Sequence, residues 1–539
     1  MVDPIVSTNG GLMRNLGAAI FRTAGGKLGF AILAVSALVA GWIAINGGLI
    51  FFIDSVDFFN YAVQLRHLNI GSYYYTIGYP ILIFLTGFTR TGSIIPLFIL
   101  QGAFAALIPW LAFKTFSEHS IKAGVAAGLT CLVSLTPYFF ENTFFHDETS
   151  LFFGLLALTF ASAFFRLRET KYIYLSSLCA IYAFLAQPAV IGFFVSCFGA
   201  IILRAFRDRS VIKHVFITLA IFGIIVIGVK KFEISSMRHR NLISEASQLG
   251  RQIFFNEYVR ASSNAPFTGL SADRLRTALV NVFKAPPDGI RGYIMGKLGN
   301  QEATYQRLFG QYEGHPVQLV SKMFSAPNRD YFEVMWNLPD LSRQITDRMF
   351  LSASLAFLYY HPLAVIEYTL SNIVDFAKGP GWHCQDDAVF PDCRTKDRIA
   401  FYPSLSDGVV LSHGKMPDKA YRFITARHVS SGWLMQAMTL AWPWIYYNLR
   451  LPFLSAMVFG WLASFWASSE LRWTLSAIVG CYVINVLLFS FLVEPLFRYQ
   501  VLNFSVSAFA AGAGGYLILQ QVAHAVVGFR RVASNSPCG

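Results

Sequence analysis

Apolar residues occur in long runs along most of this chain, and short polar connections separate them. A helix needs about 20 apolar residues to cross a hydrocarbon core that is ~30 Å thick. Runs of roughly that length begin near Leu28, Ser93, Ile121, Ser150, Tyr172, Val190, Val215, Gly432, Leu451, Trp473 and Val501. The pattern predicts an all-α polytopic membrane protein with about eleven transmembrane helices.

The charges in the short connections predict the orientation, because Lys and Arg concentrate in cytoplasmic loops. Alternate connections carry them: Arg14, Arg22 and Lys27; Lys114 and Lys122; Arg166, Arg168 and Lys171; Arg204, Arg207, Arg209 and Lys213. The tail of residues 1–27 is therefore expected in the cytoplasm, and the loops beginning at Asp54 and Thr136 outside. The first apolar run is expected to remain as an anchor, since no small-residue cleavage site follows it.

Overall composition agrees with a membrane protein, since 55% of the 539 residues are hydrophobic and 14% are charged. The formal charge of +13 could mark a nucleic-acid-binding protein. Its distribution follows the predicted membrane topology instead. No nucleic-acid partner is expected.

The polar character of the chain rises between residues 231 and 430, which are rich in Pro, Gly and Asn. This region is expected to form an extracytoplasmic domain of mixed structure. It separates an N-terminal transmembrane module, residues 28–230, from C-terminal transmembrane helices, 431–527, and a cytoplasmic tail, 528–539. One apolar stretch inside it, residues 351–377, favours an interfacial helix over a span, because Pro362, Glu367 and Asp375 interrupt it.

The cysteines fall into two groups. Four lie in apolar runs, where a free Cys behaves as a small buried hydrophobe: Cys131, Cys179, Cys197 and Cys481. Cys384 and Cys393 occur in the polar "GWHCQDDAVFPDC", on the predicted outer side, where a disulfide is permitted. A zinc site with His383 is the alternative, but four ligands at zinc spacing are absent. We expect the disulfide and no metal site.

The C-terminal topology leaves two solutions. Counting each apolar run between Gly432 and Val493 as a span would put "EPLFRYQ" in the cytoplasm. Arg530 and Arg531 are expected inside, which requires Arg498 outside and one span fewer, or a re-entrant piece. We favour Arg498 outside.

With that choice, ionisable residues gather at the outer ends of several spans. They are Asp54, Asp57, Arg66, His67, His146, Asp147, Glu148, Arg498 and Tyr499. Such groups are costly at a membrane boundary unless they are paired or hydrated, so the cluster predicts a functional site. Each residue alone has a plainer explanation: Asp54, Asp57 or Glu148 could cap a helix, and Arg498 could anchor to lipid phosphate.

The segment "DSVDFFNYAVQLRHLNIGSYYYTIGYPILIFLTGF" resembles the first external loop of the GT-C glycosyltransferases. The likeness is to bacterial relatives of protein mannosyltransferases and of lipid A aminoarabinose and galacturonic acid transferases. The family pattern, from an acidic residue to a Gly-Tyr-Pro turn, falls on Asp54, Phe58, Ala62, Gly71 and Gly78-Tyr79-Pro80. The acidic residue that opens the fourth span falls on Glu148, with Asp147 beside it, and the late Arg-Tyr pair on Arg498 and Tyr499. Ser55 replaces a second family carboxylate, which leaves Asp57 as a substitute.

The resemblance implies a GT-C-like bundle with its active site at the outer face of a bacterial inner membrane, and a polyprenyl-phosphate-linked sugar as donor. The acceptor would be a lipid, a glycan or a protein. Asp54 is expected to deprotonate the acceptor hydroxyl, and Arg498, with Arg66 as a second candidate, to bind the leaving phosphate. Glu148 is expected to hold Arg66 or the acceptor. The remaining substrate-binding candidates are Asp57, Tyr79, His146, Asp147 and Tyr499. A single base implies inversion at the anomeric carbon.

Other function classes fit parts of this pattern. A transporter or flippase also places charges along a substrate path, but few ionisable residues lie within the spans and no inverted repeat is visible. A silent assembly subunit is a third alternative. No GxGxxG follows a strand, which favours a lipid-linked donor over a soluble nucleotide sugar. Carboxylates also suit Mg²⁺ or Mn²⁺, so a divalent metal stays open, although the resemblance favours a metal-free mechanism.

Overall fold

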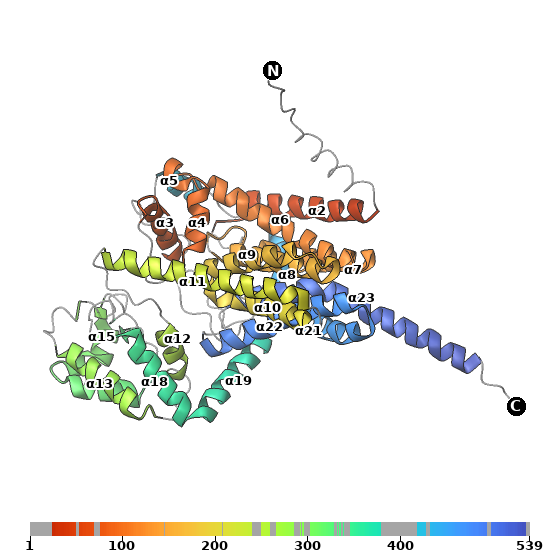
Figure 1. The fold of residues 1–539 in the computed structure, drawn as a ribbon. Coiled ribbons are helices and arrows are strands. Elements are labelled where there is room, and N and C mark those ends of the chain that lie inside the picture. Colours follow the sequence, from red (N-terminus) through yellow and green to blue (C-terminus); the bar gives the residue numbers. More distant parts are fainter. Residues whose placement is uncertain are drawn as a thin grey trace, which may run out of the picture.

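The computed structural model is helical throughout its described part, which contains no strand (Figure 1). It describes residues 24–49, 53–68, 76–144, 146–206, 209–239, 249–258, 266–284, 291–292, 294–295, 302–327, 331–332, 334–335, 338, 345–378, 418–426, 432–492 and 497–534. The predicted all-α class is confirmed. Cys384 and Cys393 lie outside these ranges, so their disulfide stays a prediction.

Within these ranges, 8 helices are long and apolar enough to cross a membrane. They are α2 (Ala24–Asn46), α6 (Ile95–Ser117), α8 (His146–Leu167), α10 (Ile191–Ala205, extended by the turn from Pro188), α11 (Ile212–His239), α21 (Trp433–Ala463), α22 (Ser469–Leu492) and α23 (Phe497–Ser534). Two shorter apolar helices, α7 (Ile121–Val133) and α9 (Lys171–Ala186), lie in the same bundle. The chain is therefore a multi-pass membrane protein, with fewer full-length spans than the eleven apolar runs suggest.

The apolar runs that begin near Gly432 and Leu451 form one continuous helix, α21, which includes Pro443 and Pro452. The two runs are therefore not separate spans, and both prolines are accommodated inside one helix, which agrees with the favoured solution of one span fewer. With α21, α22 and α23 as three antiparallel crossings, Arg498 lies at the same end of the bundle as Trp433. This arrangement has one span fewer than a count that treats the runs at Gly432 and Leu451 as separate spans.

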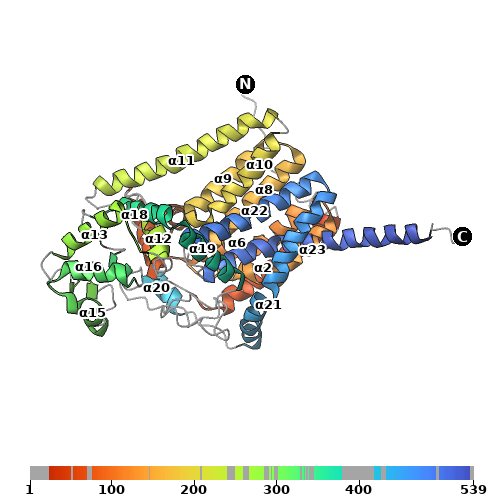
Figure 2. The same ribbon diagram turned by 90° about the horizontal axis from the view of Figure 1, so that it is seen from below.

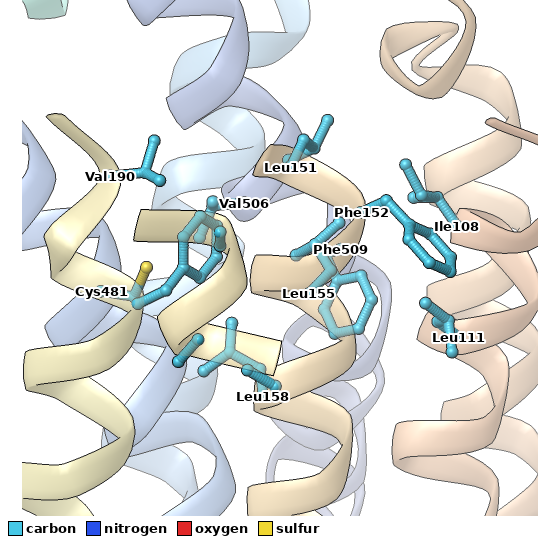
Figure 3. Packing of buried hydrophobic residues seen from close by; sticks show 14 of the residues in the cluster. Ile108, Leu111, Leu151, Phe152, Leu155, Leu158, Val190, Cys481, Val506 and Phe509 are labelled. Atoms are coloured by element: carbon cyan, nitrogen blue, oxygen red, sulfur yellow. The ribbon is translucent and has the colours of Figure 1, made fainter. Parts of the chain in front are cut away.

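Close packing holds the bundle together (Figure 3). In its centre lie Ile108, Leu111, Leu151, Phe152, Leu155, Leu158, Val190, Cys481, Val506 and Phe509. Small residues let helices approach closely where lipid offers no hydrophobic driving force. A Cβ on Gly460 of α21 would lie only 2.2 Å from the Cα of Gly514 in α23, so this crossing requires glycine. Cys131, Cys197 and Cys481 are buried, as expected for small apolar residues, whereas Cys179 is only half-buried.

Short helices form a second core at one end of the bundle (Figure 2). They are α12 (Leu249–Asn256), α13 (Leu270–Phe283), α15 (Glu302–Leu308), α16 (Pro316–Ser325) and α18 (Asp347–Tyr360). We call residues 249–360 the end domain. Every element described in it is a helix, so the mixed structure expected there is not found in the described part. The long helix α11 leads from the bundle towards this domain (Figure 2).

The stretch expected to be an interfacial helix consists of α18 and α19 (Pro362–Lys378), which meet at an angle of 102°. One face of α19 packs on α22, where the Asn372 amide donates to the Ser490 carbonyl at 2.7 Å. The opposite face exposes Leu363, Ile366 and Leu370. The stretch is therefore not one straight span, and its position at the interface stays a prediction.

Contacts between antiparallel helices fix which ends of the bundle coincide. The Thr474 hydroxyl near the start of α22 lies 3.0 Å from that of Ser162 near the end of α8. The start of α8 therefore lies at the end where α22 finishes. The end domain joins there too, because the Asn256 amide donates to the Phe491 carbonyl at 2.9 Å. We call this the domain end of the bundle.

Candidate functional site

The first turn of α8 places three predicted site residues inside the protein at the domain end. His146, Asp147 and Glu148 are 8%, 1% and 0% exposed. Gln187, at the end of α9, donates from its amide nitrogen to an Asp147 carboxylate oxygen at 3.0 Å. The Ser150 hydroxyl lies 2.6 Å from the Gln187 amide oxygen, which orients the Gln187 amide. Asp147 is thus held in a fixed position by a neighbouring helix.

Glu148 is buried in a different way. Its two carboxylate oxygens have no hydrogen-bond partner among the described residues, and the same is true of Glu141, in the turn before α8. Glu148 accordingly accepts no backbone N–H there, so a helix-cap role does not explain it. Burial, and then the charge of Glu148, raises the pKa of Glu141 well above its usual range. A buried carboxyl without a partner is costly, and a ligand hydroxyl or a cation would offset that cost.

The Gly-Tyr-Pro turn opens α4 (Gly78–Leu85) and brings Tyr79 beside Asp147. A Cβ on Gly78 would lie 2.4 Å from the backbone nitrogen of Ala186, so only glycine allows this contact with α9. The Tyr182 hydroxyl donates to the Gly78 carbonyl at 3.0 Å and fixes the turn. Burial, followed by the negative charge of Asp147, raises the pKa of Tyr79 well above its usual range. Tyr79 therefore keeps its proton, and its hydroxyl donates to the side-chain oxygen of Gln101 at 3.4 Å.

The helix α3 (Ile53–Leu65) covers this group of residues. The Phe58 ring centroid lies 5.2 Å from those of both Tyr79 and His146. Helix register places position 54 one turn before Phe58, but the Asp54 side chain lies outside the described part of the structure. The predicted base is thus placed by its backbone alone. The Tyr61 hydroxyl donates to a Glu233 carboxylate oxygen at 3.1 Å and ties α3 to α11.

Other predicted site residues lie elsewhere. Asp57 is exposed on α3, and Arg66 is exposed in the turn directly after it, so the expected contact between Arg66 and Glu148 is not present in the described structure. Hydration favours an exposed position for a long cation over desolvation beside a buried acid. Tyr499 stacks on Phe489 of α22 at 4.3 Å. The Arg498 side chain lies outside the described residues, although the Arg498 backbone begins α23.

One cation in the bundle was not among the sequence candidates. Arg450 lies in α21, and its Nε and Nη1 atoms are buried without a hydrogen-bond partner among the described residues. Its guanidinium carbon lies 5.8 Å and 5.9 Å from the ring centroids of Tyr446 and Tyr447. No ion pair of Arg450 occurs in the described ranges. A cavity of about 20 Å³ adjoins it, with Tyr482 and Gln500 in its lining, which is room for one water molecule.

A sequence signal for Arg450 does exist. An Arg inside a membrane-spanning apolar run is expensive, so its presence favours a function. Dividing the run at Leu451 hid this signal, because Arg450 then fell between two supposed spans. In the continuous helix α21 it lies within the span.

Aromatic side chains connect the acidic and the basic parts of the domain end. The ring centroid of Phe139, two residues before Glu141, lies 5.0 Å from that of Trp442 in α21. One helical turn after Trp442 in α21, the Tyr446 hydroxyl donates to the side-chain oxygen of Gln500 at 3.0 Å. The buried acids and Arg450 therefore border the same aromatic cluster.

The fold and this group of residues define a class: an all-α multi-pass membrane protein with buried acidic side chains and a half-buried arginine at one end of its bundle. Comparison with protein-family models, with curated proteins and with solved structures finds no match. Within the described ranges, no group of three or more His, Cys, Asp or Glu side chains could hold a metal ion. The bundle end itself must therefore carry any functional argument.

Proposed function

We propose that this protein is an inverting glycosyltransferase that moves a sugar from a polyprenyl-phosphate donor to a hydroxyl of a lipid, glycan or protein acceptor. One observation carries the proposal. The carboxylate oxygens of the buried Glu141 and Glu148, and the Nε and Nη1 atoms of the half-buried Arg450, have no hydrogen-bond partner among the described residues. Both groups border one aromatic cluster. A reaction between a hydroxyl and a phosphate ester requires these two kinds of group.

The acceptor hydroxyl is a poor nucleophile near neutral pH. A carboxylate removes its proton while the acceptor oxygen bonds to the anomeric carbon. We assign this step to Asp54, because its position in α3 lies one helical turn before Phe58, whose ring contacts Tyr79 and His146. Asp147 and Glu148 would accept hydrogen bonds from sugar or acceptor hydroxyls. Attack opposite to the departing oxygen inverts the configuration.

The bond from the anomeric carbon to the phosphate oxygen breaks in the same step, and both its electrons leave with the polyprenyl phosphate. Negative charge grows on that phosphate, and a guanidinium can meet two of its oxygens at once. We assign this role to Arg450 together with Arg498, which begins the neighbouring helix. The position of Arg450 within a span suits a lipid substrate that enters from the bilayer. The charge pattern of the loops supports an outer active site in a bacterial inner membrane.

A carrier or flippase of an anionic lipid is the second candidate, and the depth of Arg450 in α21 favours it specifically. A carrier moves its substrate without chemical change. Covalent transfer therefore separates the two functions.

The experiment uses purified protein in lipid nanodiscs, polyprenyl phosphate with a radiolabelled sugar, and a membrane extract as acceptor. We expect labelled product and free polyprenyl phosphate from wild type and from Glu169→Gln, which removes an exposed carboxylate at the opposite end. Asp54→Asn should bind donor and release none, and Glu148→Gln should be slower than wild type. Unchanged donor in wild type, or full activity of Asp54→Asn, would refute the proposal. Movement of intact donor across vesicles would favour the carrier.

A further inference from the structure

The end domain contains a cavity of about 590 Å³, far from the buried acids of α8 in the chain. Its lining comes from the end of α13, from residues 291–294, from α15 and from the start of α16. Small-molecule sites typically measure about 300 to 1,000 Å³. This cavity has the size of a ligand site rather than of a packing defect.

One side of the cavity carries a connected set of polar groups. An Arg291 guanidinium nitrogen lies 2.8 Å from a Glu302 carboxylate oxygen, and the other terminal nitrogen lies 4.0 Å from Glu313. The same guanidinium lies over the Tyr305 ring at 5.2 Å. The Tyr305 hydroxyl donates to Glu313 at 2.8 Å. Arg291 and Lys284, which also lines the cavity, equal Glu302 and Glu313 in number, so the ligand need not be charged.

The rest of the lining is largely apolar and includes Phe283, Tyr312 and Val317, which is 62% exposed. A purely apolar ligand would desolvate Arg291 and Glu313 without replacing their hydrogen bonds to water. A small ion would leave the apolar wall without a partner. A sugar ring fits both sides, since it has apolar C–H faces and a rim of hydroxyls.

The start of α16 adds backbone donors to the polar side. Its N-cap residue, His315, makes no side-chain capping bond. Pro316 at the first helical position has no N–H, and the Leu319 N–H bonds to the His315 carbonyl, which leaves the N–H groups of Val317 and Gln318 as the available donors. Gly314 has a φ of +78°, a left-handed conformation that favours glycine, and no heavy atom lies within 4 Å of where its Cβ would be. The turn therefore leaves open space beside these backbone groups.

We propose that this cavity binds a pyranose residue of the acceptor glycan. The assignment to the acceptor rests on the glycosyltransferase function proposed above, whereas the assignment of the sugar class rests on the cavity alone. Hydroxyls would bond to Glu313, Arg291 and the start of α16, and the ring would pack on Tyr312. The end domain would then select the acceptor while the α8 region performs the transfer.

The binding test uses the full chain in nanodiscs and saturation-transfer difference NMR with three probes: methyl mannoside, methyl galactoside and N-acetylglucosamine. We expect saturable binding of at least one probe. Tyr312→Ala and Glu313→Gln should weaken it by about tenfold, the effect of losing an aromatic face or a hydrogen bond. Tyr359→Ala, an exposed aromatic at 79% in the same domain, is the matched control and should bind as wild type does. Thermal unfolding of each variant confirms that it is folded.

Two results would overturn the assignment: no saturable binding of any probe, or equal binding by wild type, Tyr312→Ala and Glu313→Gln. A transfer assay keeps this failure distinct from failure of the proposed function. If transfer occurs and the two variants raise the acceptor KM without changing kcat, both proposals stand. If transfer occurs and the acceptor KM of both variants is unchanged, the acceptor-site proposal fails and the glycosyltransferase proposal stands. If the probes bind but no transfer occurs, the glycosyltransferase proposal fails and the cavity remains a sugar-binding site.

Discussion

Replacing Arg450 by Met should make the ligand-free protein more stable while it weakens donor binding. The side chain keeps much of its length, and the substitution removes the charge. A charged side chain at the centre of a transmembrane helix costs about 2.5 to 3.5 kcal/mol on insertion scales. Arg450 lies within α21, and its Nε and Nη1 atoms have no hydrogen-bond partner among the described residues, so its contacts with Tyr446 and Tyr447 offset only part of this cost. We expect a gain in the free energy of unfolding of about 2 kcal/mol.

The loss in binding follows from the same geometry. A hydrogen bond to a charged group contributes about 1.5 to 3 kcal/mol, so losing one guanidinium contact with phosphate should weaken donor binding by about 10-fold to 100-fold. Unfolding would be followed in nanodiscs by denaturant titration, and binding by retention of radiolabelled polyprenyl-phosphate sugar. Arg166→Met is the matched control. It removes an exposed ion pair with Glu118 at 2.7 Å, which is worth about 0 to 1 kcal/mol, and should leave donor binding unchanged.

The expected result is that Arg450→Met raises the free energy of unfolding and at the same time weakens donor binding. If Arg450→Met is less stable than wild type and binds donor equally well, the guanidinium is a structural group whose bonds lie within the protein. The role assigned to Arg450 would then be withdrawn. Loss of stability together with loss of binding would also contradict the reasoning, because an uncompensated cation should not stabilise the ligand-free state.

Three further predictions concern the surrounding structure. Burial raises the pKa of Glu257 to about 8, so between pH 5 and 8 the folded state holds a proton that the unfolded state releases. The free energy of unfolding should therefore fall by up to about 1.4 kcal/mol per pH unit as pH rises from 5 to 8. Glu257→Gln should flatten this slope, as measured by urea titration at each pH. Gly514→Ala should lower the unfolding midpoint, because the new Cβ would lie 2.2 Å from a backbone carbonyl oxygen of α21. Gly515→Ala is the control, since no heavy atom lies within 4 Å of its Cβ position. Equal midpoints for the two variants would contradict this packing. Tyr61→Phe removes the hydrogen bond to Glu233 and should cost about 1 kcal/mol, together with slower transfer because α3 loses its tie to α11; unchanged stability and rate would show that the bond has no role.

The helices of the bundle could be predicted from the sequence because the membrane imposes a simple rule. A segment in hydrocarbon must satisfy its own backbone hydrogen bonds, and its length is set by the thickness of the core. Apolar runs such as those of α6 and α8 follow this rule directly. The error at Leu451 arose because Pro452 and Arg450 together look like the end of a span. Packing against α23, which the local sequence does not reveal, keeps that stretch helical.

The polar residues of the site were only partly predictable. The acids at the start of α8 follow a polar loop and precede an apolar run, so their depth could be inferred from the sequence. Their partners could not, since Gln187 reaches Asp147 only through the packing of α9 on α8. The exposure of Arg66 likewise depends on how α3 turns on its neighbours. The end domain was the least predictable part, because its short helices are stabilised by contacts distant in sequence.

The buried Glu141 and Glu148 and the half-buried Arg450 lie at the same end of one bundle, so the cost of removing their charges from water must be offset. Direct ion pairs between them would be the usual way to offset the desolvation of both. Here no ion pair joins Glu148 to Arg450 among the described residues; the Glu148 carboxylate oxygens and the Arg450 Nε and Nη1 atoms lack hydrogen-bond partners there. A substrate with a hydroxyl at one end and a phosphate at the other would satisfy both groups at once. Its binding should therefore stabilise the wild-type chain more than the Arg450→Met variant, by RT times the logarithm of the ratio of their affinities at saturating ligand, which links the stability of this fold to its proposed chemistry.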